Sequence, residues 1–128
     1  MLQFTKEKLD AMNEIRVREF HDRLEKWLSK RNVGWGSLDE PDRRNFLARN
    51  DQRGKKYGLR TEKSRSMLAC SFLLSGDPEA FEDRADVQSV LTSERAHEFG
   101  KVRRLHAIAW GIARGSEPDT RMPRKGAS

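Results

Sequence analysis

The side chains best suited to hold a metal ion are dispersed along the chain. They are His21, Cys70, His97 and His106. A zinc site usually takes its ligands in close pairs, with roughly two to five residues between the members of a pair. No such pair of histidines or cysteines occurs here. The sequence therefore predicts no metal centre, and it indicates no other cofactor.

Acidic residues are plentiful, but no pattern singles out one of them as a general acid or base. Asp39, Glu40 and Asp42 lie where a helix is expected to begin. Acids in this position stabilise the positive end of the helix dipole, which explains them without catalysis. Signatures of a serine nucleophile, a phosphate-binding glycine loop or a dinucleotide site are also missing from the sequence. We therefore expect a protein that is not an enzyme.

Basic residues form two clusters that could contact phosphate groups. They are Arg53, Lys55, Lys56 and Arg60 around the end of one expected helix, and Arg121, Arg124 and Lys125 near the C-terminus. Nucleic-acid binding depends on such charges. However, acids lie close to each cluster, and no basic stripe follows the length of a helix. Nucleic-acid binding is therefore an alternative and not the first expectation.

The sharpest candidate for a binding surface is a row of aromatic and basic residues. Phe99, Arg103, His106 and Trp110 are spaced by four, three and four residues, so they share one face of a helix. Aromatic residues and arginine are over-represented at binding hot spots. The row could also be the edge of a broad core stripe. Trp35, which lies between two glycines, is a further candidate, either exposed as an anchor or tucked against a helix end.

A buried central helix is expected to position these residues. The segment 61–76, TEKSRSMLACSFLLSG, is polar at first and then apolar on every side of a helical wheel from Met67 to Leu74. This pattern is typical of a helix that is covered on all sides. Thr61 is suited to cap its N-terminus, and Gly76 is suited to the left-handed conformation that ends a helix.

Amphipathic segments before and after this helix predict the elements that cover it. A long N-terminal helix is expected from Thr5 to about Arg31, and a second helix from about Leu38 to Gly58. One or two short helices are expected within 77–93, and a last long helix from Ser93 to about Arg114. No segment alternates apolar and polar residues as a strand would. The fold class predicted is all-α, a compact bundle of about five helices.

The expected core and boundaries follow from the same pattern. The core residues expected are Phe20, Leu24, Trp27, Phe46, Leu68, Phe72, Leu73, Leu105 and Ile108. Residues 1–114 are expected to form a single helical domain. Residues 115–128 contain glycine, proline and charge without an apolar period, which predicts a disordered tail.

Composition indicates the kind of partner and the compartment. The chain has 128 residues, and 26 Lys and Arg against 20 Asp and Glu give a net charge of +6. This surplus favours acidic partners, whether protein, nucleic acid or phospholipid. No apolar run is long enough to span a bilayer, and the N-terminus lacks the apolar region of a signal peptide. A cytoplasmic location is expected, with Cys70 as a buried thiol.

The middle of the chain also carries short motifs that occur together in one group of bacterial proteins. They are Tyr57, Gly58 and Leu59, then Thr61 and Glu62, the apolar helix to Leu74, Gly76, Phe81, a short helix around Leu91 and a closing helix with Leu105. Over roughly residues 40–110 the chain resembles small helical proteins encoded beside type VI secretion spike and effector genes. The surplus of Lys and Arg and the basic tail depart from that pattern.

This resemblance implies an accessory role without catalytic residues. The protein would bind a secreted effector or its spike-associated carrier in the cytoplasm, as a chaperone, co-chaperone or loading adaptor. The expected function is therefore a non-catalytic protein-binding module. A nucleic-acid-binding protein, or an immunity protein that neutralises a toxin, is the alternative.

Overall fold

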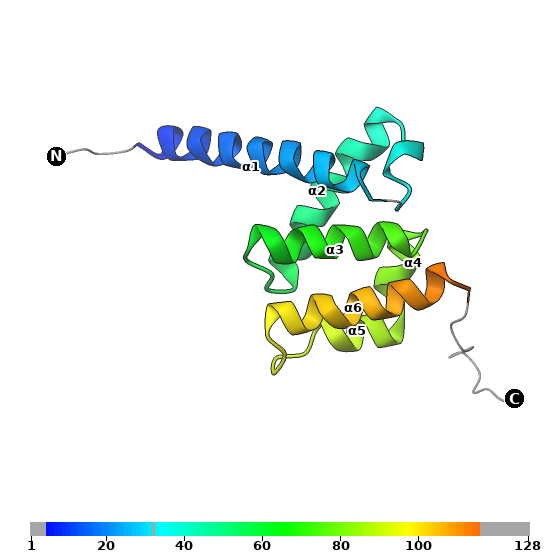
Figure 1. The fold of residues 1–128 in the computed structure, drawn as a ribbon. Helices are drawn as coiled ribbons and strands as arrows, with labels where there is room; N and C mark the ends of the chain where they lie inside the picture. Colours follow the sequence, from blue (N-terminus) through cyan, green and yellow to red (C-terminus); the bar gives the residue numbers. More distant parts are fainter. Residues whose placement is uncertain (1–4, 32, 116–128) are drawn as a thin grey trace, which may run out of the picture. The chain divides into compact units, whose positions relative to one another are not determined.

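The regular structure of this chain is helical throughout the residues that the structure describes. The structure is a computed structural model, and it describes residues 5–31 and 33–115. Six α-helices and one turn of 3-10 helix occur within these ranges, without a strand (Figure 1). They are α1 (Lys6–Ser29), η1 (Trp35–Ser37), α2 (Glu40–Lys56), α3 (Glu62–Leu74), α4 (Pro78–Asp83), α5 (Ala85–Leu91) and α6 (Glu98–Ala113). The predicted all-α class is confirmed.

The chain divides into two compact units, Met1–Asn32 and Val33–Ser128. The single domain expected for residues 1–114 stays a prediction, and the expected tail, apart from Gly115, lies outside the described residues.

The first unit contains α1, which begins where the sequence predicts. The Thr5 side chain caps this helix by accepting a hydrogen bond from the Lys8 backbone N–H at 3.1 Å. The expected core residues Phe20 and Leu24 are buried. Trp27 is only half-buried, which corrects its assignment to the core. Its ring lies under the guanidinium of Arg31, with 4.0 Å between the Arg31 Cζ atom and the ring centroid.

The second unit is arranged around α3. All six residues from Leu68 to Leu73 are buried, while Met67 and Leu74 at the two ends of the apolar run are half-buried. Thr61 caps the helix, because its side chain accepts a hydrogen bond from the Ser64 backbone N–H at 3.0 Å. Gly76 ends it with a φ of 87°. The helix contacts α2, α4 and α6, so the predicted central helix is confirmed within this unit.

The last helix is shorter than the sequence predicts. It begins at Glu98 and not at Ser93, because residues 92–97 form a turn and His97 provides the N-cap. The His97 Nδ1 atom accepts a hydrogen bond from the Phe99 backbone N–H at 3.2 Å. Val102, Leu105 and Ala109 are fully buried on α6, whereas Ile108 is half-buried at the edge of this stripe. The assignment of Ile108 to the core is therefore corrected.

Candidate functional site

A row of aromatic and basic side chains, some exposed and some half-buried, lies along α6. The row contains Phe99, Arg103, His106, Trp110 and Arg114, and we call it the α6 face. The rings of His106 and Trp110 are stacked, with 6.5 Å between their centroids and an interplanar angle of 11°. The Arg114 Cζ atom lies 5.9 Å from the centroid of the Trp110 ring. Trp110 is 48% exposed, so this large apolar side chain remains accessible beside its two neighbours.

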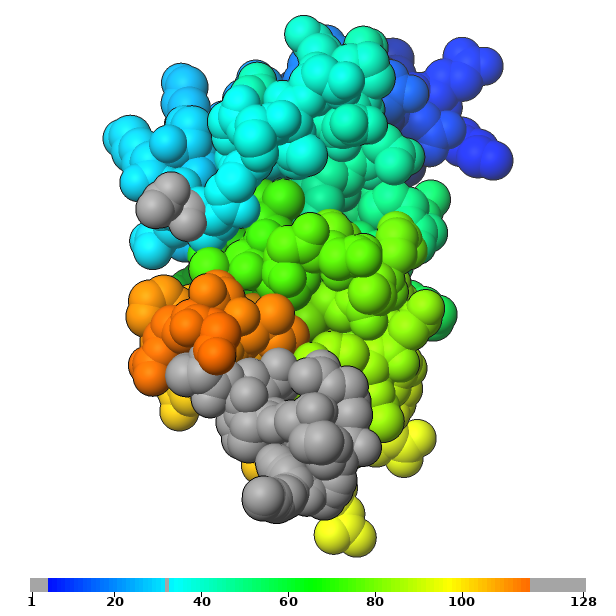
Figure 2. Space-filling view, turned by 90° about the vertical axis from the view of Figure 1, so that its right-hand side faces the viewer, coloured from blue at the N-terminus to red at the C-terminus, as the bar shows by residue number. Residues whose placement is uncertain are grey.

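The other end of the α6 face is less exposed. Phe99 is half-buried, and its ring stacks with that of His97 at 5.4 Å between centroids. The Lys63 Nζ atom lies 5.9 Å from the centroid of the Phe99 ring. Arg103 is exposed between the two ends. The four residues predicted from their spacing therefore lie on one helix, with the C-terminal end of α6 reaching the surface beside α3 (Figure 2).

The exposed charges of α6 are all positive. Arg103, Arg104 and Arg114 are exposed, and within the ranges that the structure describes none of them forms an ion pair with a carboxylate. Glu98, the acid of this helix, accepts a hydrogen bond from Ser64 of α3, so its carboxylate does not pair with these arginines. The α6 face therefore presents unpaired guanidinium groups next to an exposed aromatic ring, a combination that favours an acidic partner.

Glu98 caps the N-terminus of α3. Its Oε1 atom accepts hydrogen bonds from the Arg60 and Thr61 backbone N–H groups at 3.0 and 3.1 Å. It also accepts one from the Ser64 hydroxyl at 2.6 Å. The bond from Ser64, followed by the bond from the Thr61 backbone, lowers the pKa of Glu98 from 4.5 to about 2. Sequence reasoning missed this role, because the bonded residues are 34 to 38 positions apart.

Lys101 makes the matching contact with the C-terminus of α2. Its Nζ atom donates a hydrogen bond to the backbone carbonyl of Tyr57 at 3.0 Å. A cation stabilises the C-terminal end of a helix and an anion stabilises the N-terminal end. Lys101 and Glu98 therefore attach the first turn of α6 to two other helices, which supports the α6 face on a fixed element.

Trp35 is not part of this surface. It is 3% exposed, and its ring lies edge-on to that of Phe46 with 6.1 Å between centroids. Arg43 covers the ring, and its Nε atom donates a hydrogen bond to the Trp35 carbonyl at 3.3 Å. Of the two alternatives for Trp35, the tucked one is observed, so its ring offers no exposed surface to a partner in this structure.

The basic cluster at the end of α2 is partly used inside the protein. The Arg53 side chain is 3% exposed, and its Nε atom lies 2.7 Å from the Glu82 carboxylate. Tyr57 donates a hydrogen bond from its hydroxyl to the same carboxylate at 2.6 Å. Arg53 is therefore removed from the set of expected phosphate contacts, while Lys55, Lys56 and Arg60 are exposed. The second cluster, Arg121, Arg124 and Lys125, lies outside the described residues.

The candidate metal ligands stay apart in the part of the chain that the structure describes. Nowhere in residues 5–31 and 33–115 do three His, Cys, Asp or Glu side chains form a group that could hold a metal ion. Cys70 is buried in α3. In the same ranges, every helix is too short or too polar to cross a membrane.

No protein-family model, curated protein or solved structure matches the chain. The link to type VI secretion therefore stays a prediction from the sequence.

The low pKa of Glu98 predicts an acid-dependent loss of stability. Because its pKa in the folded protein is about 2 and its ordinary value is 4.5, the carboxylate stabilises the fold above the ordinary value. This contribution is lost as the pH falls from 4.5 towards 2. We expect Glu98→Gln to lower the thermal midpoint at about pH 6, with a smaller difference from the wild type at about pH 2.5.

Circular dichroism melting curves at the two pH values measure this difference. Glu94→Gln is the matched control, because Glu94 is an exposed acid in the turn before α6. It is expected to melt like the wild type at both values. Equal midpoints for Glu98→Gln and the wild type at about pH 6 would show that the cap contributes nothing.

Proposed function

We propose that this chain is a non-catalytic protein-binding module that binds an acidic protein segment through the α6 face. Trp110 carries the proposal, because its ring is 48% exposed although it is stacked with His106 and flanked by Arg114. Tryptophan has only two rotatable side-chain bonds, so it loses little conformational freedom when a partner covers it. Tryptophan and arginine are also the residues most often found at binding hot spots.

The charges of the α6 face support an acidic partner. Arg103 and Arg114 lie exposed on this face without carboxylate partners among the described residues. A guanidinium group binds a carboxylate through two parallel hydrogen bonds, which gives both affinity and orientation. A segment with acidic residues beside an apolar side chain would satisfy the arginines and cover Trp110 at the same time.

The sequence resemblance suggests which partner to test first. It favours a type VI secretion effector or a spike-associated protein as the partner. This chain would bind that partner in the cytoplasm as a chaperone, co-chaperone or loading adaptor. An immunity protein would instead neutralise the activity of the toxin that it binds. Measuring the toxin's activity with and without this chain separates the two roles.

Removing the aromatic side chains of the α6 face should weaken partner binding. We expect Phe99→Ala/Trp110→Ala to raise the dissociation constant for the partner at least about tenfold, because hot-spot aromatics often contribute more than about 1.4 kcal/mol each. Affinity chromatography from the native cell with mass spectrometry identifies the partner, and calorimetry with the purified partner measures the constant.

Two further variants make the result specific. Arg44→Ala/Lys55→Ala removes two exposed charges from α2 and should bind the partner like the wild type. Circular dichroism shows whether loss of the half-buried Phe99 ring reduces the helix content of the double variant. If it does, Trp110→Ala alone is used in its place. Unchanged affinity in the folded aromatic variant would remove the α6 face from consideration.

Nucleic-acid binding is the competing outcome of the same experiment. Arginines beside an exposed aromatic ring also occur where proteins stack single-stranded bases. Retention of single-stranded DNA or RNA that falls steeply with added salt and is lost in Trp110→Ala would support this outcome. If the chain retained nucleic acid in this way and bound no protein, the proposal would be overturned.

A further inference from the structure

The N-terminal half of α1 is an uncovered stretch of helix that carries apolar side chains. Every residue from Lys6 to Glu19 is exposed. Among the described residues, five large apolar side chains are exposed, and four of them belong to this stretch: Leu9, Met12, Ile15 and Val17. An uncovered helix of this length is only marginally stable in water, because most helical stability comes from packing of an apolar face. This half of α1 is therefore suited to packing against another helix.

Four exposed residues of this half form a row whose spacing is the same in both directions. Lys8, Met12, Ile15 and Glu19 are separated by four, three and four residues, which is typical of the seam of a helix pair. We call them the α1 row. It has a base at one end, an acid at the other and two apolar residues between them, of which Met12 is 38% and Ile15 is 54% exposed.

This pattern is complementary to itself when two copies run in opposite directions. An antiparallel second copy would place its Ile15 opposite Met12 and its Glu19 opposite Lys8. A parallel copy would instead bring the two Lys8 side chains together, and likewise the two Glu19 side chains. Like charges at such a contact are destabilising, so the α1 row favours the antiparallel arrangement.

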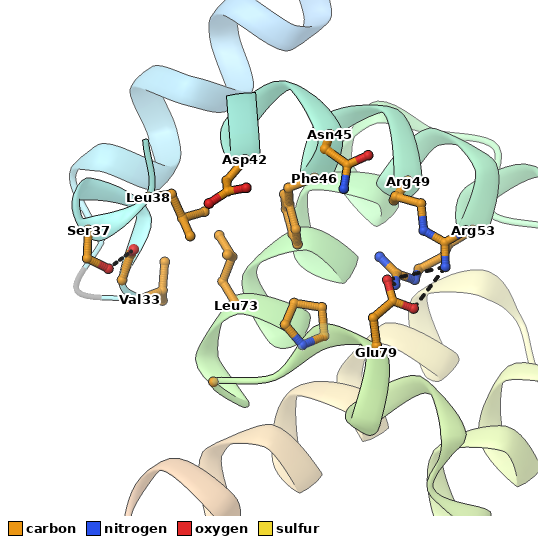
Figure 3. A pocket seen from close by; sticks show the side chains of 13 residues that line it. Val33, Ser37, Leu38, Asp42, Asn45, Phe46, Arg49, Arg53, Leu73 and Glu79 are labelled. Atoms are coloured by element: carbon orange, nitrogen blue, oxygen red, sulfur yellow. Dashed lines mark hydrogen bonds and ion pairs between the residues drawn. The ribbon is translucent and has the colours of Figure 1, made fainter. Parts of the chain in front are cut away.

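The two charges of the α1 row are not used within the part of the chain that the structure describes. There, neither Lys8 nor Glu19 forms an ion pair. The charges in a pocket of about 320 Å³ beside α2 differ in this respect (Figure 3). In that pocket Glu79 lies between Arg49 and Arg53 and pairs with each of them at 2.9 Å. Lys8 and Glu19 therefore remain available to a second molecule.

The charge balance of this half of α1 favours a second copy over an acidic partner. Residues 6–19 contain four basic side chains, Lys6, Lys8, Arg16 and Arg18, and four acidic ones, Glu7, Asp10, Glu14 and Glu19. The segment is therefore neutral, although the whole chain has a net charge of +6. Two copies can meet through a neutral segment without bringing like net charges together, whereas an acidic partner gains no net attraction from it.

We propose that two copies of this chain associate through the α1 row as an antiparallel helix pair. Met12 of each copy packs on Ile15 of the other, and two ion pairs between Lys8 and Glu19 lie at the ends of the contact. The α6 face is not part of this contact, so either surface can exist without the other.

Sedimentation velocity of the full chain over a series of concentrations measures this association. We expect a reversible change from monomer to dimer. Ile15→Asp should raise the dissociation constant of the dimer at least about tenfold, because it places a charge in the apolar part of both symmetric contacts. Val17→Asp is the matched control, because Val17 is 44% exposed on the opposite side of the helix. It should dimerise like the wild type.

Exchanging the two charges tests the antiparallel direction. Lys8→Glu and Glu19→Lys should each raise the dissociation constant at least about fivefold, because each puts like charges opposite one another at both ends of the dimer. The double variant Lys8→Glu/Glu19→Lys restores opposite charges and should dimerise like the wild type. Circular dichroism checks that each variant keeps its helix content.

Several results would overturn the inference. They are a chain that stays monomeric up to about 1 mM, equal dimerisation by Ile15→Asp and Val17→Asp, or no recovery in the double charge variant. Phe99→Ala/Trp110→Ala should dimerise normally, which separates a failure of the α1 row from a failure of the α6 face. Loss of the dimer in that variant alone would assign the contact to the α6 face instead.

Discussion

Glu82→Ala is expected to lower the free energy of unfolding by about 3–5 kcal/mol, the usual effect of removing one partner of a buried ion pair. The Glu82 carboxylate is 2.7 Å from the Arg53 Nε atom and accepts a hydrogen bond from the Tyr57 hydroxyl at 2.6 Å. Without it, a guanidinium that is 3% exposed would remain in the protein with much less compensation. Urea denaturation followed by circular dichroism measures the change.

Glu79→Ala is the matched control for this prediction. Glu79 also pairs with Arg53, at 2.9 Å, but its side chain is 65% exposed. Exposed ion pairs contribute about 1 kcal/mol or less, so this variant should be only slightly destabilised. Similar small losses for both variants would show that Arg53 does not depend on Glu82.

The pH dependence of Glu82 has the same direction as that of Glu98. Burial alone would raise the pKa of Glu82, but the hydrogen bonds from Tyr57 and Arg53 and the nearby positive charges outweigh it and lower this pKa. The carboxylate therefore contributes stability above the ordinary pKa of a glutamate, and this contribution is lost as the pH falls through the lowered pKa.

Phe72→Ala is expected to cost about 3–5 kcal/mol of unfolding free energy, the range for removing a large buried ring. Phe72 is 0% exposed in the last turn of α3. Its ring lies edge-on to that of Phe81, with 4.9 Å between centroids, and under the Arg53 guanidinium at 4.6 Å. The substitution therefore leaves a cavity at the point where α2, α3 and α4 meet.

Met67→Ala provides the comparison on the same helix. Met67 is half-buried at the beginning of the apolar run, so its truncation should cost about half as much or less. Denaturation curves of the two variants give the difference. An equal cost at both positions would contradict the identification of α3 as the centre of the second unit.

The helices could be predicted because their signals are local in the sequence. Thr61 and Gly76 mark the two ends of α3, and Thr5 marks the beginning of α1. Each capping bond joins residues a few positions apart, so the sequence alone reveals it. The beginning of α6 was predicted wrongly because Ser93 is also a good capping residue, whereas His97 is the residue that caps the helix.

Interactions between distant residues could not be predicted in this way. Arg53 was expected to be exposed because it lies in a basic cluster, but α4 places Glu82 against it from 29 positions away. Glu98 caps α3 by the same kind of long-range contact. The pocket beside α2 likewise depends on how several helices meet. The α6 face could be predicted from residue spacing, because one helix contains Phe99, Arg103, His106 and Trp110.

Photo-crosslinking from position 110 tests the central claim most directly. Trp110 is replaced by p-benzoylphenylalanine in the full chain, and the products formed in the native cell are identified by mass spectrometry. The same replacement at Ala48, exposed on α2, is the control. We predict that position 110, and not position 48, crosslinks to a protein with an acidic segment. The same products from both positions, or crosslinks to nucleic acid alone, would contradict a protein-binding role for the α6 face.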